Sequence, residues 1–289
     1  MRKAFSFLIA VAAIMVFCAF QQDHKVTVFM IGDSTMANKD TTGGKQERGW
    51  GMMLQPFFND PYVIDNHAVN GRSSKSFIDE GRWQVVLDKI QPGDYVIIQF
   101  GHNDEKPAVD RHTDPGSTFD DNLRRYVRET REKGGNPILC NCVVRRNFLR
   151  HVDSSVEDES LRDVKYSDEQ VNSDTLIDTH GAYREVPKYI AKEMNVPFID
   201  ANKITHDLEE GLGVIKSRKL HMWFKPGETP SIPDGRRDNT HYNIPGATKV
   251  ASLLAQEMAD KIPALRPHIN KKMIRKVRKN FDKYIKKTE

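Results

Sequence analysis

The sequence predicts a three-layer α/β/α sandwich built around a five-stranded parallel sheet. Five short apolar segments rich in β-branched and aromatic residues recur along the chain. Several are continuously apolar rather than alternating, which is typical of strands covered on both faces. Helical patterns lie between these segments, and such alternation favours parallel strands with helices on both sides of the sheet.

The expected strands are residues 26–31, 62–64, 95–100, 137–144 and 196–199. The expected helices are residues 50–58, 81–90, 119–133, 183–194 and 244–259. Gly134 and Gly135 follow the third helix and supply a residue type that commonly ends helices. A chain of 289 residues, 38% hydrophobic and 29% charged, sustains one core, so we expect a single catalytic body at residues 21–262.

The first twenty residues differ from the rest of the chain. Arg2 and Lys3 precede an apolar run, which is the pattern of a secretory signal peptide. An uncleaved anchor is the alternative because the run approaches the length of a membrane span. Cys18 leaves a lipoprotein anchor open, although the bulky Phe17 disfavours it. We therefore expect a secreted or periplasmic protein whose mature chain has no membrane span.

Residues 263–289 form a basic tail. From residue 266 onward it contains ten Lys or Arg and two Asp or Glu, a net charge of +8 in a chain whose total is +4. Its apolar residues recur every four positions and predict an amphipathic helix; they are Ile269, Met273, Val277, Phe281 and Ile285. A basic tail is compatible with nucleic acid or an anionic surface. No nucleic-acid motif accompanies it, so we expect a docked helix with a solvated basic face and no nucleic-acid partner.

Three successive expected strands end in residues that suit catalysis. Ser34 follows the first strand in Gly32-Asp33-Ser34, Gly71 follows the second, and Asn103 follows the third in Gly101-His102-Asn103-Asp104. The carboxyl ends of parallel strands are where α/β proteins bind ligands. A glycine admits close backbone approach, and a neutral amide donor suits an oxyanion. Taken singly, each residue is explained equally well as a helix cap or a turn residue.

A fourth element lies just before the last helix of the body, in Asp238-Asn239-Thr240-His241. Histidine is the side chain that ordinarily titrates near neutral pH, so it suits the base of a serine nucleophile. Such a histidine also needs a partner that fixes its tautomer, and Asp238 lies within local reach. The alternative is that Asp238 or Thr240 caps the following helix.

The order of these elements resembles the four sequence blocks of the GDSL/SGNH hydrolases. Further segments resemble the rhamnogalacturonan acetylesterase branch of that superfamily: residues 31–37, 47–51, 70–77, 100–107, 144–148, 178–181 and 238–243. These matches run from residue 26 to about residue 260. Residues 149–176 are longer than this branch usually carries, and the basic tail lies outside the shared pattern.

The resemblance implies a flavodoxin-like SGNH hydrolase fold and a serine esterase mechanism. It implies that Ser34 is the nucleophile, that His241 is the base and that Asp238 orients His241. It also implies an oxyanion hole made of the backbone N–H groups of Ser34 and Gly71 with the side chain of Asn103. No cofactor or metal is expected, since such a triad supplies both nucleophile and base.

The expected function is deacetylation of a plant cell-wall polysaccharide, with acetylated pectin or rhamnogalacturonan first. Acetylxylan or another sugar ester is the alternative substrate, and a carbohydrate-binding protein on an inactive esterase fold is the non-enzymatic alternative. Arg72, Arg145 and Arg146 are candidates for binding a uronate carboxylate, because guanidinium groups suit carboxylates. Trp223 is a candidate for stacking on a sugar, although aromatic residues more often belong to the core.

Overall fold

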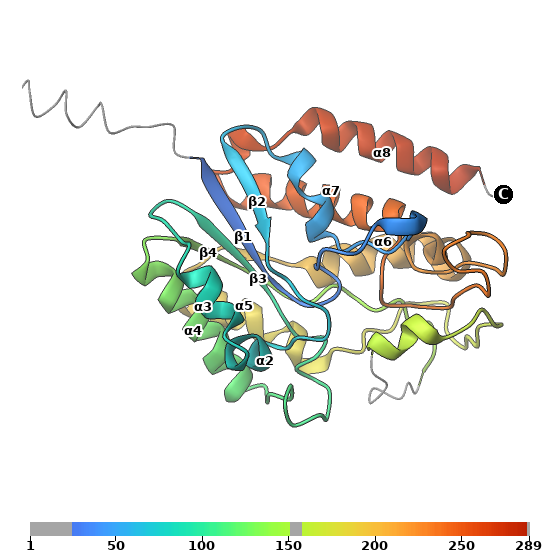
Figure 1. Cartoon of the computed structure of the whole chain (residues 1–289), viewed down its shortest axis with the longest axis horizontal. Helices are drawn as coiled ribbons and strands as arrows, with labels where there is room; N and C mark the ends of the chain where they lie inside the picture. Colours follow the sequence, from blue (N-terminus) through green and yellow to red (C-terminus); the bar gives the residue numbers. More distant parts are fainter. Residues whose placement is uncertain (1–24, 151–157, 288–289) are drawn as a thin grey trace, which may run out of the picture.

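The computed structural model describes residues 25–150 and 158–287 (Figure 1). Its centre is one sheet of five parallel strands in the order β2-β1-β3-β4-β5. The strands are β1 (Val26–Gly32), β2 (Tyr62–Asn66), β3 (Tyr95–Gln99), β4 (Asn136–Cys140) and β5 (Phe198–Ile199). The predicted fold class is confirmed. The strand order reverses between β1 and β3, which is where α/β sheets form a ligand crevice.

Both faces of the central strands are buried, as their continuous apolar sequences predict. In β1, Val28 and Met30 belong to one hydrophobic core, whereas Phe29 and Ile31 belong to a second core on the other face. The five residues of β3 are all buried. Burial on both sides fixes which way each side chain points, because a shift of one residue would exchange the two faces.

Helices cover both faces of the sheet, and the helices on one face are longer than those on the other (Figure 1). The first core is closed by α6 (Ala201–Lys216), α7 (Ile244–Lys261) and α8 (Lys271–Lys286). The second core is closed by α2 (Ser74–Asp79), α3 (Arg82–Leu87), α4 (Thr118–Glu132) and α5 (Val186–Glu193). Within the described ranges, no helix is long and apolar enough to cross a membrane.

Two helix predictions need correction. The helix expected at residues 50–58 is instead a pair of 3₁₀ turns, η2 (Gly51–Met53) and η3 (Gln55–Phe57). Pro56 explains the break, because it lacks an N–H and its ring clashes with the preceding turn of an α-helix. In place of the helix expected at residues 183–194, the chain forms the 3₁₀ turn η5 (Gly181–Arg184) and then the shorter α5 (Val186–Glu193). The helices α2 and α6 were not predicted.

The helix α8 packs along α7 and completes the first core. Ile269 before it, and Phe281 and Ile285 within it, are buried, while Met273 and Val277 are partly buried against the same core. The expected signal peptide at residues 1–20, with Cys18, lies outside the described residues. It stays a prediction.

Candidate active site

Ser34 lies in a tight turn that follows β1. The amides of Met36 and Ala37 both donate to the carbonyl of Asp33, at 3.2 and 3.0 Å. Gly32 ends the strand, and a Cβ at this position would lie 2.7 Å from the carbonyl oxygen of Gln99 on β3. A glycine is therefore required where β1 passes β3 at the start of the turn.

His241 reaches Ser34 from a segment 207 residues further along the chain. Its Nε2 lies 3.0 Å from Ser34 Oγ, and its Nδ1 lies 2.8 Å from Oδ2 of Asp238. All three side chains are buried. The structure thus brings together the three residues expected to form a triad, in the hydrogen-bonded order that a serine hydrolase requires.

Asp238 is held by several donors. Its Oδ1 accepts the backbone N–H groups of Thr240 and His241, at 2.8 and 2.9 Å. Its Oδ2 accepts a short hydrogen bond from the guanidinium of Arg236 in addition to facing His241. Burial opposes ionisation, but the charges of His241 and Arg236 outweigh it and hold the pKa of Asp238 below its ordinary value. The carboxylate is therefore fixed in the ionised form facing the imidazole.

The turn that carries Ser34 is braced from β3. Asp33 Oδ1 accepts from the amide and from the hydroxyl of Thr35, at 2.9 and 2.7 Å. Gln99 donates to the same hydroxyl oxygen at 2.9 Å and accepts from the indole nitrogen of Trp50 at 2.8 Å. Because all these groups are buried, the turn has little freedom to move relative to the sheet.

Asn103 and Gly71 lie in the loops after β3 and β2. Asn103 is buried, and its Nδ2 donates to the carbonyl of Arg72 at 3.2 Å, which leaves the second amide hydrogen for another acceptor. Arg111 donates to its Oδ1 at 3.4 Å. Gly71 has a φ of 73°, a conformation that favours glycine. The loop after β2 and the loop after β3 are thus joined by Asn103.

Asp104 anchors the Asn103 loop. Its carboxylate accepts from the amide and hydroxyl of Ser74 at the start of α2, from the amide of Gly101 and from the hydroxyl of Thr113. Burial raises the pKa of Asp104 to about 7 against these hydrogen bonds. Asp104 therefore ties the Asn103 loop to the start of α2.

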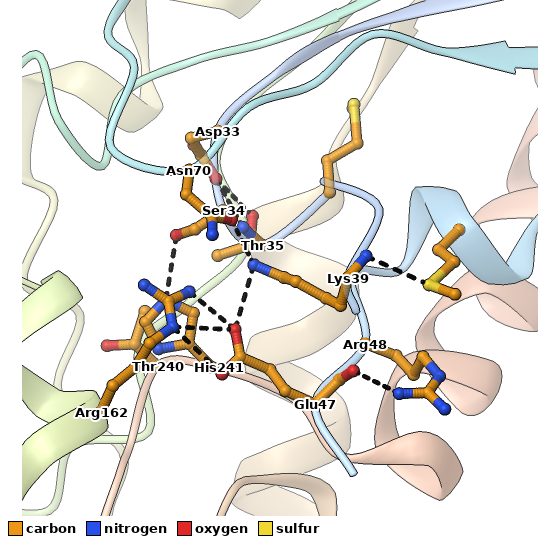
Figure 2. Close-up of polar contacts among 12 residues, drawn as sticks. Asp33, Ser34, Thr35, Lys39, Glu47, Arg48, Asn70, Arg162, Thr240 and His241 are labelled. Atoms are coloured by element: carbon orange, nitrogen blue, oxygen red, sulfur yellow. Dashed lines mark hydrogen bonds and ion pairs between the residues drawn. The ribbon is translucent and has the colours of Figure 1, made fainter. Parts of the chain in front are cut away.

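A pocket of about 400 Å³ is lined largely by charged side chains, and Ser34, His241 and Asp238 are not among its lining residues. Glu47 is one of the lining residues, and its carboxylate contacts Lys39 at 3.0 Å and Arg162 at 2.6 Å (Figure 2). Lys39 also donates to Asn70, the neighbour of Gly71, at 2.5 Å. Burial lowers the pKa of Lys39 to about 8 although the charge of Glu47 opposes this shift. Figure 2 shows Lys39, Glu47 and Arg162 near Ser34 and His241, so this charged part of the pocket wall lies close to the triad.

Arg162 comes from η4 (Asp158–Asp163), within the 149–176 stretch whose role the sequence left open. The sequence also gave no role to Lys39, Glu47 or Arg236. Glu47 opens the segment Glu47-Arg48-Gly49-Trp50-Gly51, so its presence in a family-like segment was the available signal. Arg236 lies two residues before Asp238, a spacing that lets the guanidinium reach the carboxylate.

None of the four candidate substrate contacts lines this pocket; they are Arg72, Arg145, Arg146 and Trp223. Arg72 is one-third exposed and donates to Glu80 at 3.0 Å and to the carbonyl of Asn70 at 2.9 Å. It is the one member of the set that lies beside the loop of Gly71.

Arg145 and Arg146 are committed to internal ion pairs, which departs from the expected contact with a substrate carboxylate. Arg145 makes a short contact with Glu105, which also lies 3.0 Å from Nδ1 of His180. Arg146 is fully buried and makes a short contact with Glu169. Buried ion pairs of this kind are costly to break, so these guanidinium groups serve the fold.

Trp223 is also part of a structural cluster. Its indole nitrogen donates to Asn239 Oδ1 at 2.7 Å, and the guanidinium of Arg218 lies 4.6 Å from its ring centroid. Arg146 donates to the same Asn239 oxygen at 2.9 Å. Trp223 and Arg146 therefore hold Asn239, the residue that follows Asp238. They support the triad through this neighbour and do not line the pocket.

Comparison with known proteins agrees with this geometry. The model of the GDSL-like lipase/acylhydrolase family matches residues 30–249. The rhamnogalacturonan acetylesterase RhgT of Bacillus subtilis is 37% identical over 84% of this chain and 94% of its own length. The probable rhamnogalacturonan acetylesterase YesY of the same organism is 30% identical over 79% of this chain and 90% of its own length.

The solved structures agree on the fold. Protein YxiM of Bacillus subtilis superposes with a TM-score of 0.62 and 24% identity over 82% of this chain, which spans 57% of that longer structure. A catalytic mutant of the acetylxylan esterase Axe2 from Geobacillus stearothermophilus superposes with a TM-score of 0.51 and 16% identity. It is matched over 82% of this chain and 96% of its own length. The chain belongs to the GDSL-like lipase/acylhydrolase family and is a carboxylic ester hydrolase.

Proposed function

We propose that the protein removes O-acetyl groups from a plant cell-wall polysaccharide, with acetylated rhamnogalacturonan or pectin as the substrate. The observation that carries the proposal is the hydrogen-bonded series from Ser34 through His241 to Asp238. The names of RhgT and YesY, which match nearly their full lengths, support the substrate. The protein acts outside the cytoplasm, in the periplasm or beyond, since residues 1–20 have the composition of a signal peptide.

The reaction follows from the positions of the side chains. Ser34 Oγ attacks the acetyl carbonyl while His241 Nε2 takes the hydroxyl proton, and the carbonyl oxygen becomes an oxyanion. The backbone N–H groups of Ser34 and Gly71 and the second amide hydrogen of Asn103 stabilise that oxyanion. Collapse of the intermediate expels the sugar oxygen, which takes the proton from His241 and leaves an acetyl group on Ser34.

The second half-reaction releases acetate. A water molecule enters, His241 removes its proton, and the resulting hydroxide attacks the acetyl carbon. The new tetrahedral intermediate collapses, Ser34 Oγ recovers the proton from His241, and acetate leaves. Throughout both halves, the ionised Asp238 stabilises the imidazolium of His241 and holds its Nδ1–H.

The test is acetate release from acetylated pectin and acetylated xylan, compared for the wild type and Ser34→Ala. We expect release from pectin that Ser34→Ala abolishes. Strong release from xylan alone would contradict the substrate and leave the serine mechanism intact. Acetate release that persists in Ser34→Ala would contradict the mechanism itself.

A further inference from the structure

We propose that Glu47 and Arg236 are positioning residues for Asp238, and that η4 completes their arrangement through Arg162. The proposal rests on the proposed function, because it concerns the Ser34, His241 and Asp238 site. It gives a role to the Glu47 segment and to η4, which the family-level mechanism does not use.

Arg236 joins two carboxylates. Its side chain is 7% exposed; Nη1 donates to Glu47 Oε2 at 3.0 Å and Nη2 makes a short contact with Asp238 Oδ2. That oxygen of Asp238 is the one that faces Nδ1 of His241. The planar guanidinium therefore fixes the carboxylate orientation on which the imidazole depends.

Glu47 in turn is fixed by cations from three separate segments. Lys39 lies in the segment after the Ser34 turn and Arg162 lies in η4 (Figure 2). Arg236 lies in the loop before Asp238. The backbone of Glu47 also forms a β-bridge with Asn243, two residues after His241. The carboxylate is thus tied to the histidine segment through both main chain and side chains.

The charges around His241 oppose one another. Asp33 lies in the turn after β1, Lys39 and Glu47 lie in the segment that follows, Arg162 lies in η4, and Arg236 and Asp238 precede the histidine. Anions in this group favour the imidazolium, which is inactive as a base, and cations disfavour it. Removal of Glu47 and removal of Arg236 must therefore displace the acid limb of the pH–rate profile in opposite directions.

The experiment measures kcat/KM against pH with a small aryl acetate, so that polysaccharide binding does not enter. Glu47→Gln should move the acid limb to lower pH, and Arg236→Gln should move it to higher pH, each by about half a unit to one unit at an effective dielectric constant near 20. Arg162→Gln should move it in the same direction as Arg236→Gln, by less. Arg236→Lys keeps the positive charge but loses the planar guanidinium that bridges Glu47 and Asp238. It should therefore lower kcat with little change in the acid limb of the pH–rate profile.

Glu129→Gln and Arg124→Gln are matched controls, since both side chains form ion pairs on the opposite face of the sheet. Neither should move the limb. Glu47→Gln and Arg236→Gln shifts of the same sign, or no shift in either, would overturn the proposal. If Arg236→Gln does not fold, Glu47→Gln and Arg162→Gln still test whether removal of an anion and removal of a cation shift the acid limb in opposite directions. Because the substrate is an aryl acetate, failure on pectin would not affect this result.

A different observation concerns α8. All eight Lys and Arg side chains between residues 271 and 286 are exposed, and Asp282 is the one acidic residue among them. Among the described residues, none of these eight forms an ion pair with a carboxylate. Several pairs of like charge are four residues apart, such as Lys272 with Lys276 and Lys279 with Lys283, an arrangement that destabilises a helix. The exposed face of α8 therefore carries a dense positive charge, although the repulsion between these side chains lowers the stability of the helix.

This helix ends on the active-site side of the molecule. Lys219 donates to the carbonyl of Ile285 at 3.1 Å, and Tyr284 donates to the carbonyl of Lys219 at 3.3 Å. The same carbonyl accepts from Asn243, which begins α7 two residues after His241. The basic face therefore runs toward the edge of the sheet where Ser34 lies. It also lies beyond residue 249, where the family model ends.

From charge complementarity we infer that the exposed face of α8 binds a polyanionic, uronate-bearing polysaccharide chain and holds it near the site. This rests on the proposed substrate class. The probe is polygalacturonate without acetyl groups, so that binding is measured apart from turnover. The wild type should bind polygalacturonate but not neutral xylan, and binding should weaken strongly at about 0.5 M salt because the Debye length shortens.

The variant is Lys276→Gln with Lys279→Gln and Lys283→Gln, and the control is Lys133→Gln with Lys188→Gln and Lys192→Gln. The control removes three exposed charges from the opposite face of the sheet. We expect at least about tenfold weaker binding for the α8 variant, wild-type binding for the control and equal aryl acetate hydrolysis by both. Equal loss in both variants, or binding to phosphatidylglycerol vesicles without binding to polygalacturonate, would overturn the inference. If pectin is not deacetylated but this binding persists, the proposed substrate fails and the binding surface stands.

Discussion

The indole nitrogen of Trp50 donates to Gln99 Oε1 at 2.8 Å, so a side chain from a loop fastens the end of β3. Gln99 passes this constraint to Thr35, the residue after Ser34. The nucleophile is therefore held by a buried polar series whose members lie far apart in the sequence. The first prediction tests this series.

Gln99→Leu should destabilise the protein by about 1–3 kcal/mol, because it leaves the Trp50 N–H without its buried acceptor. It should also lower kcat, since the Thr35 hydroxyl loses its donor. Urea unfolding and aryl acetate kinetics measure the two effects. An unchanged free energy of unfolding would show that the hydrogen bonds of Gln99 to Trp50 and Thr35 do not stabilise the fold.

Gly32→Ala should destabilise the protein by about 1–3 kcal/mol, because the added methyl group would lie 2.7 Å from the carbonyl oxygen of Gln99. Gly211→Ala is the matched control: it lies in α6, where a Cβ meets nothing within 4 Å. The control should stabilise the helix by about 0.5–1 kcal/mol. Thermal unfolding of both variants provides the comparison.

Asp238→Asn should lower kcat by about 10⁴ on any acetate ester, because an amide cannot stabilise the imidazolium and selects the wrong tautomer. The fold should survive, since Asn keeps the shape of the side chain. Near-wild-type turnover by a folded Asp238→Asn protein would show that His241 does not depend on this carboxylate.

Lys39 should make stability depend on pH above neutrality. Its pKa is lowered by burial to about 8 from 10.5, so between these values the unfolded chain binds more protons than the folded one. Stability therefore rises with pH across this window, and deprotonation relieves a burial cost of about 1–3 kcal/mol that is present below pH 8. Lys39→Met should remove this rise. Urea unfolding of both proteins from pH 7 to pH 10.5 measures it, and parallel curves would contradict the assignment.

The strands were accessible from the sequence because burial on both faces leaves continuous apolar runs. The helix α6 was not, since Gly211 and Gly213 interrupt its pattern and Gly213 has a φ of 70°. The prediction of a helix at residues 50–58 was wrong because Pro56 breaks an α-helix even where the apolar spacing favours one. Buried Trp50 and Phe57 explain that spacing without an α-helix.

The residues at the strand ends were recognisable because each stands in a short local motif. The ion pairs of Glu47 were not, since Arg162 and Arg236 are separated from it by 115 and 189 residues. Arg145 and Arg146 looked available for a substrate because the acidic partners that bury them, Glu105 and Glu169, also lie elsewhere in the chain. A sequence shows that a charge exists, but only the fold shows which opposite charge neutralises it.

Ser34 follows the first β-strand of the body and His241 lies in the segment before its last helix, so a piece of the chain that ends before residue 241 contains the nucleophile without its base. A ribosome makes the nucleophile early and the base about 200 residues later. A chain still being synthesised, or one threaded unfolded across a membrane, therefore has no hydrolytic centre. Hydrolytic activity therefore appears only after the segment that carries His241 has been synthesised and has folded against Ser34.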